Sequence, residues 1–500
     1  MSAYSVLAAL DGNVDGETDT TPGRYATGSD DAGHIARAFT LTRMLAAALV
    51  VSMSVWLDDA ALVALLVIVV SAACRSWLLA LMLIVLAVAG MVRSEEAWLS
   101  VVPDDLGTYR GWVLVVDDPQ PFASSTRVIV QVDGERFEVW SRGRAQQLRV
   151  RTWHGGEWVA ASGRRVELDP QRAGRVAWQH VVGEFELEWA SDVHAGGPVA
   201  RASNRVRAAI ERAGDELPHH DGALFRGLVV GDDRDQPREM IDRFRASGLS
   251  HLTAVSGQNV SFLLAAAGPL LRRLRPRLRW AVTLGLIIWF VTLTRFEPSI
   301  VRAGVMAGLS TTAFVLGRDR SPIRILAVAV ILLVLVDPLL VWSVGFWLSV
   351  GATFGVSAIG PWLAARFAGF DRTGLFALPL GVTLGAQVGV VVPSVLVFGR
   401  LPLVSIPANL LAVPVAGLVM LYGMPAGLIA GWMPSTAPVL MFPARLGTRW
   451  VDTVASIGAR LEPEPPAQFV GWGVVVLIVV LLLWFSRNTA DTHGDLPADR

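Results

Sequence analysis

The stretch Phe244–Leu271, FRASGLSHLTAVSGQNVSFLLAAAGPLL, changes from a charged surface segment into an apolar helix within a few residues. A polar segment, Ser256-Gly257-Gln258-Asn259, stands at the change, and a run of arginines from Arg272 to Arg279 follows. Polar side chains at the mouth of a membrane segment are costly unless they face protein or water. The stretch therefore predicts a polar site where a membrane helix begins.

The composition is that of a membrane protein. Of the 500 residues 53% are hydrophobic, and the mean hydropathy is +0.49, too apolar for a soluble chain of this length. We expect a multi-pass membrane protein. All 43 basic residues are arginine. This bias fits either a GC-rich genome or recognition of phosphate, which arginine contacts with two parallel hydrogen bonds.

Cysteine and histidine give little sign of a metal or cofactor. Cys74 is the single cysteine, so neither an intrachain disulfide nor a cysteine zinc cluster can form. The histidines are scattered without the HExxH spacing of a hydrolytic site. Two short segments could bind a metal ion. For His219-His220-Asp221 a solvated loop is the simpler interpretation, and for the acids of Asp232–Asp235 it is a helix cap and turn. We predict no cofactor, no metal and no catalytic residues.

The N-terminal part divides into a tail and short apolar runs. Residues 1–40 read as a disordered acidic tail. Residues 41–92 hold three apolar runs, 41–57, 60–74 and 76–92, which predict transmembrane helices near the lower limit of length. The charges at Arg43, Asp58-Asp59 and Arg75 place the following domain outside the cytoplasm.

Residues 95–190 alternate between apolar and polar positions. Arg127–Val132 and Glu135–Trp140 flank Asp133-Gly134, the signature of a β-hairpin. Further strands are expected at Gly111–Val116, Leu148–Trp153 and Glu157–Leu168. Short strands at this spacing predict a small barrel.

Aromatic and arginine side chains interleave in this region, the combination that single-stranded nucleic acid requires. The candidates for contact with a strand are Trp140, Arg149, Arg151, Trp153 and Trp158. The alternative is that the aromatic rings form the barrel core and the arginines a solvated face.

Residues 198–486 predict a second membrane region. A surface helix is expected over 198–217, and membrane helices over 252–271, 280–296, 300–317, 323–341, 342–361, 376–398, 403–430 and 468–486. Arginine-rich loops alternate with loops that lack arginine, which places the barrel outside. The prolines in 403–430 leave a re-entrant hairpin as an alternative, and 441–461 looks amphipathic and interfacial. Residues 487–500 read as a polar tail.

The central motif resembles the ComEC competence-protein family, whose members form the inner-membrane channel for transforming DNA. The pattern SGLSHLxAxSGxxV is carried by Ser247 to Leu252, Ala254, Ser256, Gly257 and Val260. The family often has Leu-His where this chain has Gln258-Asn259, so a titratable imidazole is missing there. Three later blocks also resemble the family, around Ser299–Ala303, Asp337–Ser349 and Phe398–Pro414.

The resemblance covers roughly residues 95–485 and implies the fold class. We expect a polytopic α-helical membrane protein with a small extracytoplasmic OB-like β-barrel domain over 95–190 and a competence-type channel domain over 198–486. Many family members continue into a metallo-β-lactamase-like domain, whose histidine motif we do not find before Arg500. We therefore expect strand degradation to depend on a separate nuclease.

By resemblance, the function is import of single-stranded DNA across the plasma membrane in natural transformation. The expected partners are single-stranded DNA, membrane lipids, a DNA receptor and a cytoplasmic ATPase, since no GxxxxGK[ST] motif occurs. Polar groups in apolar helices are the candidates for a permeation path: Ser256, Gly257, Gln258, Asn259, Arg302, Gln387 and Asn409. Alternatives are a structural ion pair for Arg302, helix packing for Asn409, and, for the whole chain, a transporter of another solute or polymer.

Overall fold

A computed structural model describes residues 29–57, 59–74, 77–122, 125–253, 256–318, 321–369, 371 and 376–492. The chain divides into two compact units, one of Met1–Ala208 with Gly257–Phe346 and one of Ala209–Ser256 with Trp347–Arg500. The predictions for residues 1–28, Asp58, Arg75, Ala254 and 493–500 concern positions outside the described residues.

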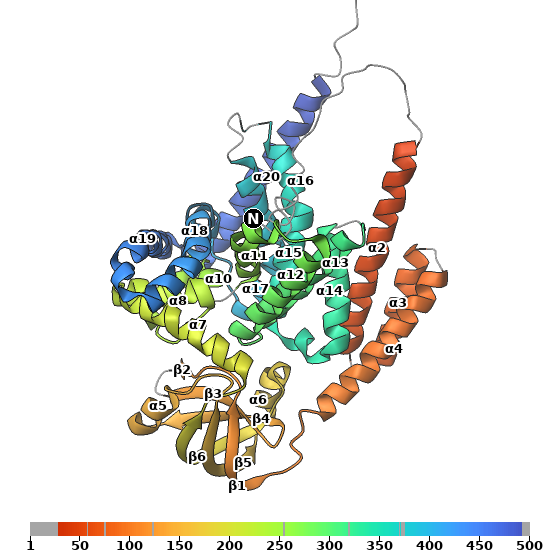
Figure 1. The fold of residues 1–500 in the computed structure, drawn as a ribbon. Coiled ribbons are helices and arrows are strands. Elements are labelled where there is room, and N and C mark those ends of the chain that lie inside the picture. Colours follow the sequence, from red (N-terminus) through yellow and green to blue (C-terminus); the bar gives the residue numbers. More distant parts are fainter. Residues whose placement is uncertain are drawn as a thin grey trace, which may run out of the picture. The chain divides into compact units, whose positions relative to one another are not determined.

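The first unit begins with three helices, α2 (Ser29–Trp56), α3 (Ala60–Cys74) and α4 (Trp77–Leu99), where the apolar runs predicted them. The helix α2 starts at Ser29, so residues 29–40 are helical and do not belong to the predicted tail. Figure 1 shows α3 and α4 lying side by side. Buried side chains such as Val50 and Leu83 form the core between these helices.

Six strands follow as one sheet domain in the first unit (Figure 1). They are β1 (Gly107–Val115), β2 (Gln120–Phe122), β3 (Ser125–Val132), β4 (Glu135–Arg142), β5 (Trp158–Glu167) and β6 (Val181–His194). The predicted hairpin is confirmed, because β3 pairs with β4 from Val132 and Glu135 outward. Asp133 and Gly134 both have positive φ, as a two-residue hairpin turn requires.

The strand pairings close on themselves. Antiparallel pairs join β1 to β5, β5 to β6, β3 to β4 and β3 to β1, and β4 pairs in parallel with β6. This ring is what the barrel prediction required, while assignment to the OB class stays a prediction. The interior is apolar, with Phe137, Trp153 and Phe185 at most 1% exposed. Burying such a side chain fully contributes about 1.5–3 kcal/mol to stability.

One predicted strand is wrong. Residues 148–153 belong to the short helix α5 (Arg144–Val150) and the turn after it, not to a strand. The alternation of Leu148 and Val150 with arginines suggested a strand, but the two buried side chains are Val150 and Trp153, whose spacing of three residues fits a helical turn. The helix α6 (Pro170–Val176) and the turn η1 (Ala177–Gln179) join β5 to β6.

The rest of the first unit is helical. After the first half of α7 (Pro198–Asp215), it contains α11 (Gly257–Leu271), α12 (Pro276–Leu293), α13 (Pro298–Val315), α14 (Pro322–Val336) and the turn η2 (Pro338–Trp342). Proline stands in the first turn of α12, α13 and α14, where its missing N–H has no intrahelical partner to lose. The helix predicted over 252–271 is shorter in the structure, because α11 begins at Gly257. The helix predicted over 323–341 ends at Val336.

The second unit holds the helices α8 (His219–Val230), α9 (Arg238–Ala246), α10 (Ser250–Thr253), α15 (Val344–Phe354), α16 (Gly360–Phe367), α17 (Ala377–Phe398), α18 (Ser405–Trp432), α19 (Ala437–Leu461) and α20 (Pro465–Thr492), with η4 (Pro434–Thr436) before α19. Helix α18 is continuous through Pro414 and Pro425, so the re-entrant hairpin is wrong. Helix α20 extends to Thr492, beyond the predicted end at residue 486.

Glycines bring α17 against α15 and α16 across a π turn, η3 (Gly355–Ile359). A Cβ atom added to Gly351 would lie 2.2 Å from the Gly389 carbonyl oxygen, and one added to Gly355 would lie 2.0 Å from the Gly385 carbonyl oxygen. Both neighbours are backbone and cannot rotate away. Glycine at these positions therefore allows the helices to pack backbone against backbone, and we call this contact the glycine seam.

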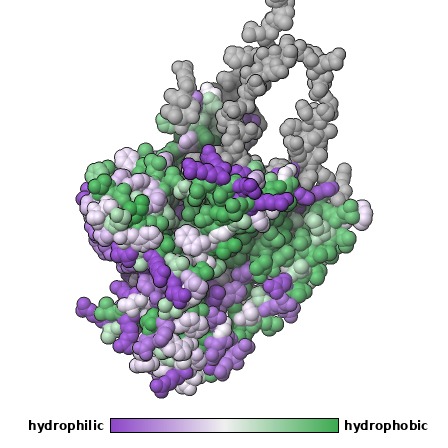
Figure 2. Space-filling model, viewed as in Figure 1, coloured by the Kyte–Doolittle hydropathy of each residue, from purple (hydrophilic) through white to green (hydrophobic). Residues whose placement is uncertain are grey.

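Five helices in the described part of the chain are long and apolar enough to cross a membrane: α4, α12, α15–α16, α17 and α18. Shorter apolar helices lie at Leu41–Trp56, Ala60–Cys74, Pro322–Val336 and Ala467–Leu481. In Figure 2 the helices carry broad hydrophobic surface, whereas the sheet domain is mostly hydrophilic or intermediate. The fold is therefore that of a polytopic helical membrane protein with a β-sheet domain.

Candidate functional site

The polar segment at the start of α11 lies against Arg302 of α13. A Cβ atom on Gly257 would stand 3.0 Å from the Ala303 Cβ and 3.3 Å from an Arg302 Nη atom. Arg302 is 4% exposed, and its other Nη atom lies 3.0 Å from the Met306 sulfur. Glycine at the first position of α11 therefore lets the two helices approach at the guanidinium group.

The neighbours of Gly257 differ in exposure. Asn259 is buried at 4% exposure, whereas Gln258 is half-buried. Gly257, Gln258, Asn259 and Arg302 all belong to the first unit, and Ser256 belongs to the second. In the first unit the structure thus places a buried cation, Arg302, beside the first residue of α11, and a buried amide, Asn259, two residues further along that helix.

A second polar group lies within the helices of the second unit. The side-chain amide of Gln387 on α17 donates to the Ser405 hydroxyl at 2.9 Å. Ser405 opens α18, and Asn409 follows it one turn later on the same face, half-buried. Gly248 has φ +72°, and an added Cβ would lie 2.5 Å from the Ser405 Cβ. The motif residue Gly248 therefore packs on the start of α18.

The sheet-domain candidates for strand contact separate into covered and open side chains. Trp153 is 1% exposed and belongs to the core, so its predicted role in surface stacking is wrong. The Trp140 ring lies 4.5 Å from the Arg172 guanidinium, and its indole N–H donates to Glu138 at 2.8 Å. Trp158 is 42% exposed, and Arg149 and Arg151 are exposed.

A fully buried carboxylate explains why Trp140 is held in place. Glu138 is 0% exposed and forms ion pairs with Arg127 and Arg172, each at 2.6 Å. A buried charge is costly unless partners of opposite charge and hydrogen bonds surround it. Arg127 and Arg172 therefore serve the structure of the sheet domain, and Trp140 is part of that arrangement.

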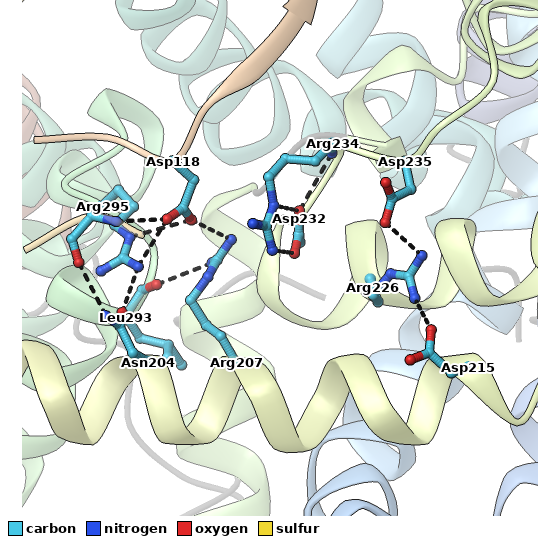
Figure 3. A network of polar contacts seen from close by, with 11 residues as sticks. Asp118, Asn204, Arg207, Asp215, Arg226, Asp232, Arg234, Asp235, Leu293 and Arg295 are labelled. Carbon is cyan, nitrogen blue, oxygen red and sulfur yellow. Dashed lines mark hydrogen bonds and ion pairs between the residues drawn. The ribbon is translucent and has the colours of Figure 1, made fainter. Parts of the chain in front are cut away.

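A second buried carboxylate, Asp118, was not predicted from the sequence and joins the sheet domain to helices of the first unit. Figure 3 shows Arg207 of α7 and Arg295, from the loop between α12 and α13, pointing toward it. Nη atoms of these arginines lie 2.8 and 3.0 Å from the carboxylate oxygens. The backbone N–H of Gly155 also donates to Asp118, at 2.9 Å. We call this group the Asp118 junction.

Further contacts complete the Asp118 junction. Arg295 donates to the Asn204 side chain at 2.7 Å, and Arg207 donates to the Leu293 carbonyl oxygen at 3.3 Å. Arg295 has φ 58°, a left-handed conformation that costs a non-glycine residue roughly 1–2 kcal/mol. The interactions of its guanidinium group offset this cost. The junction thereby fixes the sheet domain to the membrane helices of its own unit.

Asp117, beside the junction, has an unusual acidity. Burial raises the pKa of the Asp117 carboxyl to about 6, and the neighbouring Asp118 carboxylate adds to the increase against the opposing effect of nearby arginines. A second point of attachment between the sheet domain and the helical part of the first unit is the contact of the His180 Nε2 atom with the Asp337 carboxylate, at 3.1 Å. Asp337 belongs to one of the motif blocks and also accepts from the Leu339 backbone N–H.

The acidic segments with a metal-binding alternative are paired with arginine in the second unit. Asp232 binds Arg234 at 2.6 Å, and Asp235 shares Arg226 with Asp215, as Figure 3 shows. Asp221 accepts from Arg449 at 3.2 Å. Among the described residues, no group of three His, Cys, Asp or Glu side chains is placed to hold a metal ion.

The fold and the polar groups within its helices define a class, a multi-pass plasma-membrane protein that carries an extra-membrane β-sheet domain. Comparison with known families then gives the closer identity. The Competence protein family matches residues 228–489, which include the glycine seam and Arg302. The chain belongs to this family.

Curated relatives agree with the assignment. ComE operon protein 3 of Bacillus subtilis is 30% identical over 201 residues, 40% of this chain and 25% of the relative. Competence protein ComA of Neisseria gonorrhoeae is 28% identical over 316 residues, 56% of this chain and 44% of the relative. An uncharacterized protein of Escherichia coli, YcaI, is 26% identical over 217 residues, 40% of this chain and 28% of the relative.

The matched segments thus span between a quarter and less than half of the relatives' own lengths. No solved structure matches the chain.

Proposed function

We propose that this protein is a channel that imports single-stranded DNA across the plasma membrane during natural transformation. The observation that carries the proposal is the family match over residues 228–489, which coincides with the helices that hold the polar groups. Two relatives bear competence names, ComE operon protein 3 and Competence protein ComA. Transport of a polymer across the membrane, with no chemical step, is the activity we assign.

The buried guanidinium of Arg302 supports a role in passage of an anionic strand. A strand carries one negative charge per nucleotide, and a fixed cation inside a membrane protein lowers the cost of bringing that charge in. Gly257 keeps the space beside this cation free of a side chain. Gln258 and Asn259 supply amide groups at the same helix end, and Gln387 and Asn409 do so in the second unit.

The proposal includes partners. A DNA receptor would deliver the strand and a cytoplasmic ATPase would supply energy. A separate nuclease would remove the complementary strand. Membrane lipids surround the helices, whose outward side chains are apolar, for example Ile288 and Leu396 at 65% and 79% exposure.

The test is uptake of labelled DNA into competent cells with and without this chain, scored as label protected from added nuclease. We expect deletion to abolish protected label and the wild-type gene to restore it. Equal uptake in both strains would contradict DNA import and favour a transporter of another solute or polymer.

Arg302→Ala tests the channel role more finely in the same assay. We expect at least a tenfold loss of uptake at unchanged protein level, because the buried cation is removed. The matched control is Arg277→Ala, which removes an exposed arginine near the start of α12. Unchanged uptake by the Arg302 variant would remove this residue from the pathway without deciding the function of the chain.

A further inference from the structure

The outer face of the sheet domain carries a group of exposed aromatic rings on three adjacent strands. Trp112 on β1, Trp158 on β5 and Trp189 on β6 are 44%, 42% and 47% exposed, and His194 at the end of β6 is exposed as well. We call these four residues the aromatic face. Large exposed aromatic groups on an extra-membrane domain mark a binding surface rather than a core.

The strand register places the four rings on one side of the sheet. Trp158 pairs with Leu114 on β1 and with His194 on β6, Trp112 pairs with Ala160, and Trp189 pairs with Ser162. Residues directly opposite each other point to the same face, and rows two residues apart are separated by about 7 Å. The Trp112 and His194 rings approach to 4.5 Å between centroids across the small Ala160 side chain.

Cations accompany the rings. Arg110 and Arg164 are exposed and continue the same face, since Arg110 pairs with Ser162 and Arg164 with Thr108. Neither forms an ion pair with another residue that the structure describes. Arg149, also exposed, donates to the Ala190 carbonyl oxygen of β6 at 2.7 Å. The guanidinium groups of Arg110 and Arg164 are available to phosphate oxygens.

The β6 side of the aromatic face is acidic instead. Glu186 is opposite Arg164, and Glu188 and Asp192 are exposed on the same strand. Carboxylates repel a phosphodiester chain, so an anionic strand is favoured only along the β1 and β5 side. The charges therefore orient a ligand, with its phosphates toward Arg110 and Arg164 and its flat groups over the rings.

We propose that the aromatic face binds single-stranded nucleic acid by stacking bases on Trp112, Trp158 and Trp189. This inference rests on the proposed function and gives it a receiving surface that differs from the predicted one. Trp153 is buried and Trp140 is covered by Arg172, so only Trp158 is common to both sets. Stacking does not depend on the base sequence of the nucleic acid, because every base presents a flat aromatic face.

The test is fluorescence anisotropy of a labelled oligothymidylate with the full-length protein in lipid nanodiscs. Each lost ring is expected to weaken binding about fivefold to a hundredfold, so the double variant Trp112→Ala with Trp189→Ala should lose at least tenfold. The matched control is Trp140→Phe, in the same domain but beneath Arg172, and should bind like wild type. Circular dichroism melting checks that each variant is folded.

A second double variant tests the same face without removing any tryptophan ring. Arg110→Glu with Arg164→Glu changes exposed side chains only and should weaken binding and reduce its dependence on salt. Equal binding by wild type and by both double variants would overturn the inference and leave the proposed function standing. Displacement of the oligonucleotide by a neutral oligosaccharide at this face would also overturn it. Failure of the proposed function is recognised separately, as unchanged DNA uptake in the deletion strain.

Discussion

The Asp118 junction and the glycine seam connect parts of the chain in opposite ways. At the junction, one buried carboxylate holds two arginines from different helical segments at 2.8 and 3.0 Å. At the seam, helices meet with backbone against backbone and no charge is involved. The junction stands in the first unit beside the sheet domain, and the seam stands among the membrane helices of the second.

The difference follows from the surroundings of each connection. Near the sheet domain, charged groups reach water in the unfolded chain and need partners of opposite charge when they become buried. Among membrane helices, lipid is as apolar as any side chain, so close approach of small residues supplies the contact energy. The junction should therefore respond to changes of charge, and the seam to changes of volume.

Asp118→Ala should have the largest effect. The substitution leaves Arg207 and Arg295 buried without their shared carboxylate, which we expect to destabilise the first unit by about 3–5 kcal/mol. The measurement is thermal unfolding of the purified protein in detergent, with limited proteolysis to report release of the sheet domain. The control is Asp105→Ala, whose side chain is 70% exposed while it pairs with Arg165. A melting temperature equal to that of wild type would show that the junction contributes nothing.

Gly355→Ala tests the response to volume at the seam. Its added Cβ would lie 2.0 Å from the Gly385 carbonyl oxygen, so α17 must shift, at an expected cost of about 1–3 kcal/mol. The control is Gly369→Ala, where an added Cβ meets no atom within 4 Å. Unfolding of both variants in the same detergent provides the comparison. If the two variants melt alike, close packing at Gly355 is not what holds these helices together.

Asp117→Asn should have the smallest effect and depend on pH. The folded-state pKa of about 6 is above the ordinary value of 3.8, so the stability contribution of Asp117 is present below pH 3.8 and lost as the pH rises through 6. The shift corresponds to at most about 3 kcal/mol, and we expect roughly 1–2 because the side chain is only partly buried.

At pH 7 the asparagine variant should therefore unfold at a higher temperature than wild type, and the difference should vanish near pH 4. Asp192→Asn, on the exposed surface of β6, serves as the control. The same difference at both pH values would show that Asp117 ionisation is not the cause.

Short sequence patterns predicted those elements whose conformation depends only on residues close to them in the chain. The β3–β4 hairpin was readable because Asp133-Gly134 fixes the turn without help from the rest of the chain. The prediction for residues 148–153 failed because Leu148 and Val150 alternate with arginines as in a strand, whereas packing buries Val150 and Trp153, three residues apart as in a helical turn. The proline-containing helix α18 was uncertain for a similar reason, since neighbouring helices can stabilise a proline inside a membrane helix.

Contacts between distant residues were harder to predict. Asp118 and Arg295 are 177 residues apart, and nothing in either segment points to the other. The aromatic face escaped notice because strand order decides which tryptophans share a side, and β6 was not predicted as a strand. By contrast, Arg302 stood out from the sequence because a cation is costly in an apolar helix wherever its partner lies.

The position of β6 in the ring of strands has a consequence for biosynthesis. It is the last strand to be made, yet it lies between β4 and β5, pairing in parallel with one and antiparallel with the other. Until Val181–His194 has been synthesised, both neighbours keep an open edge able to pair with strands of other chains. The sheet domain therefore cannot mature strand by strand as it emerges, and a product that stops before Val181 would be prone to aggregate.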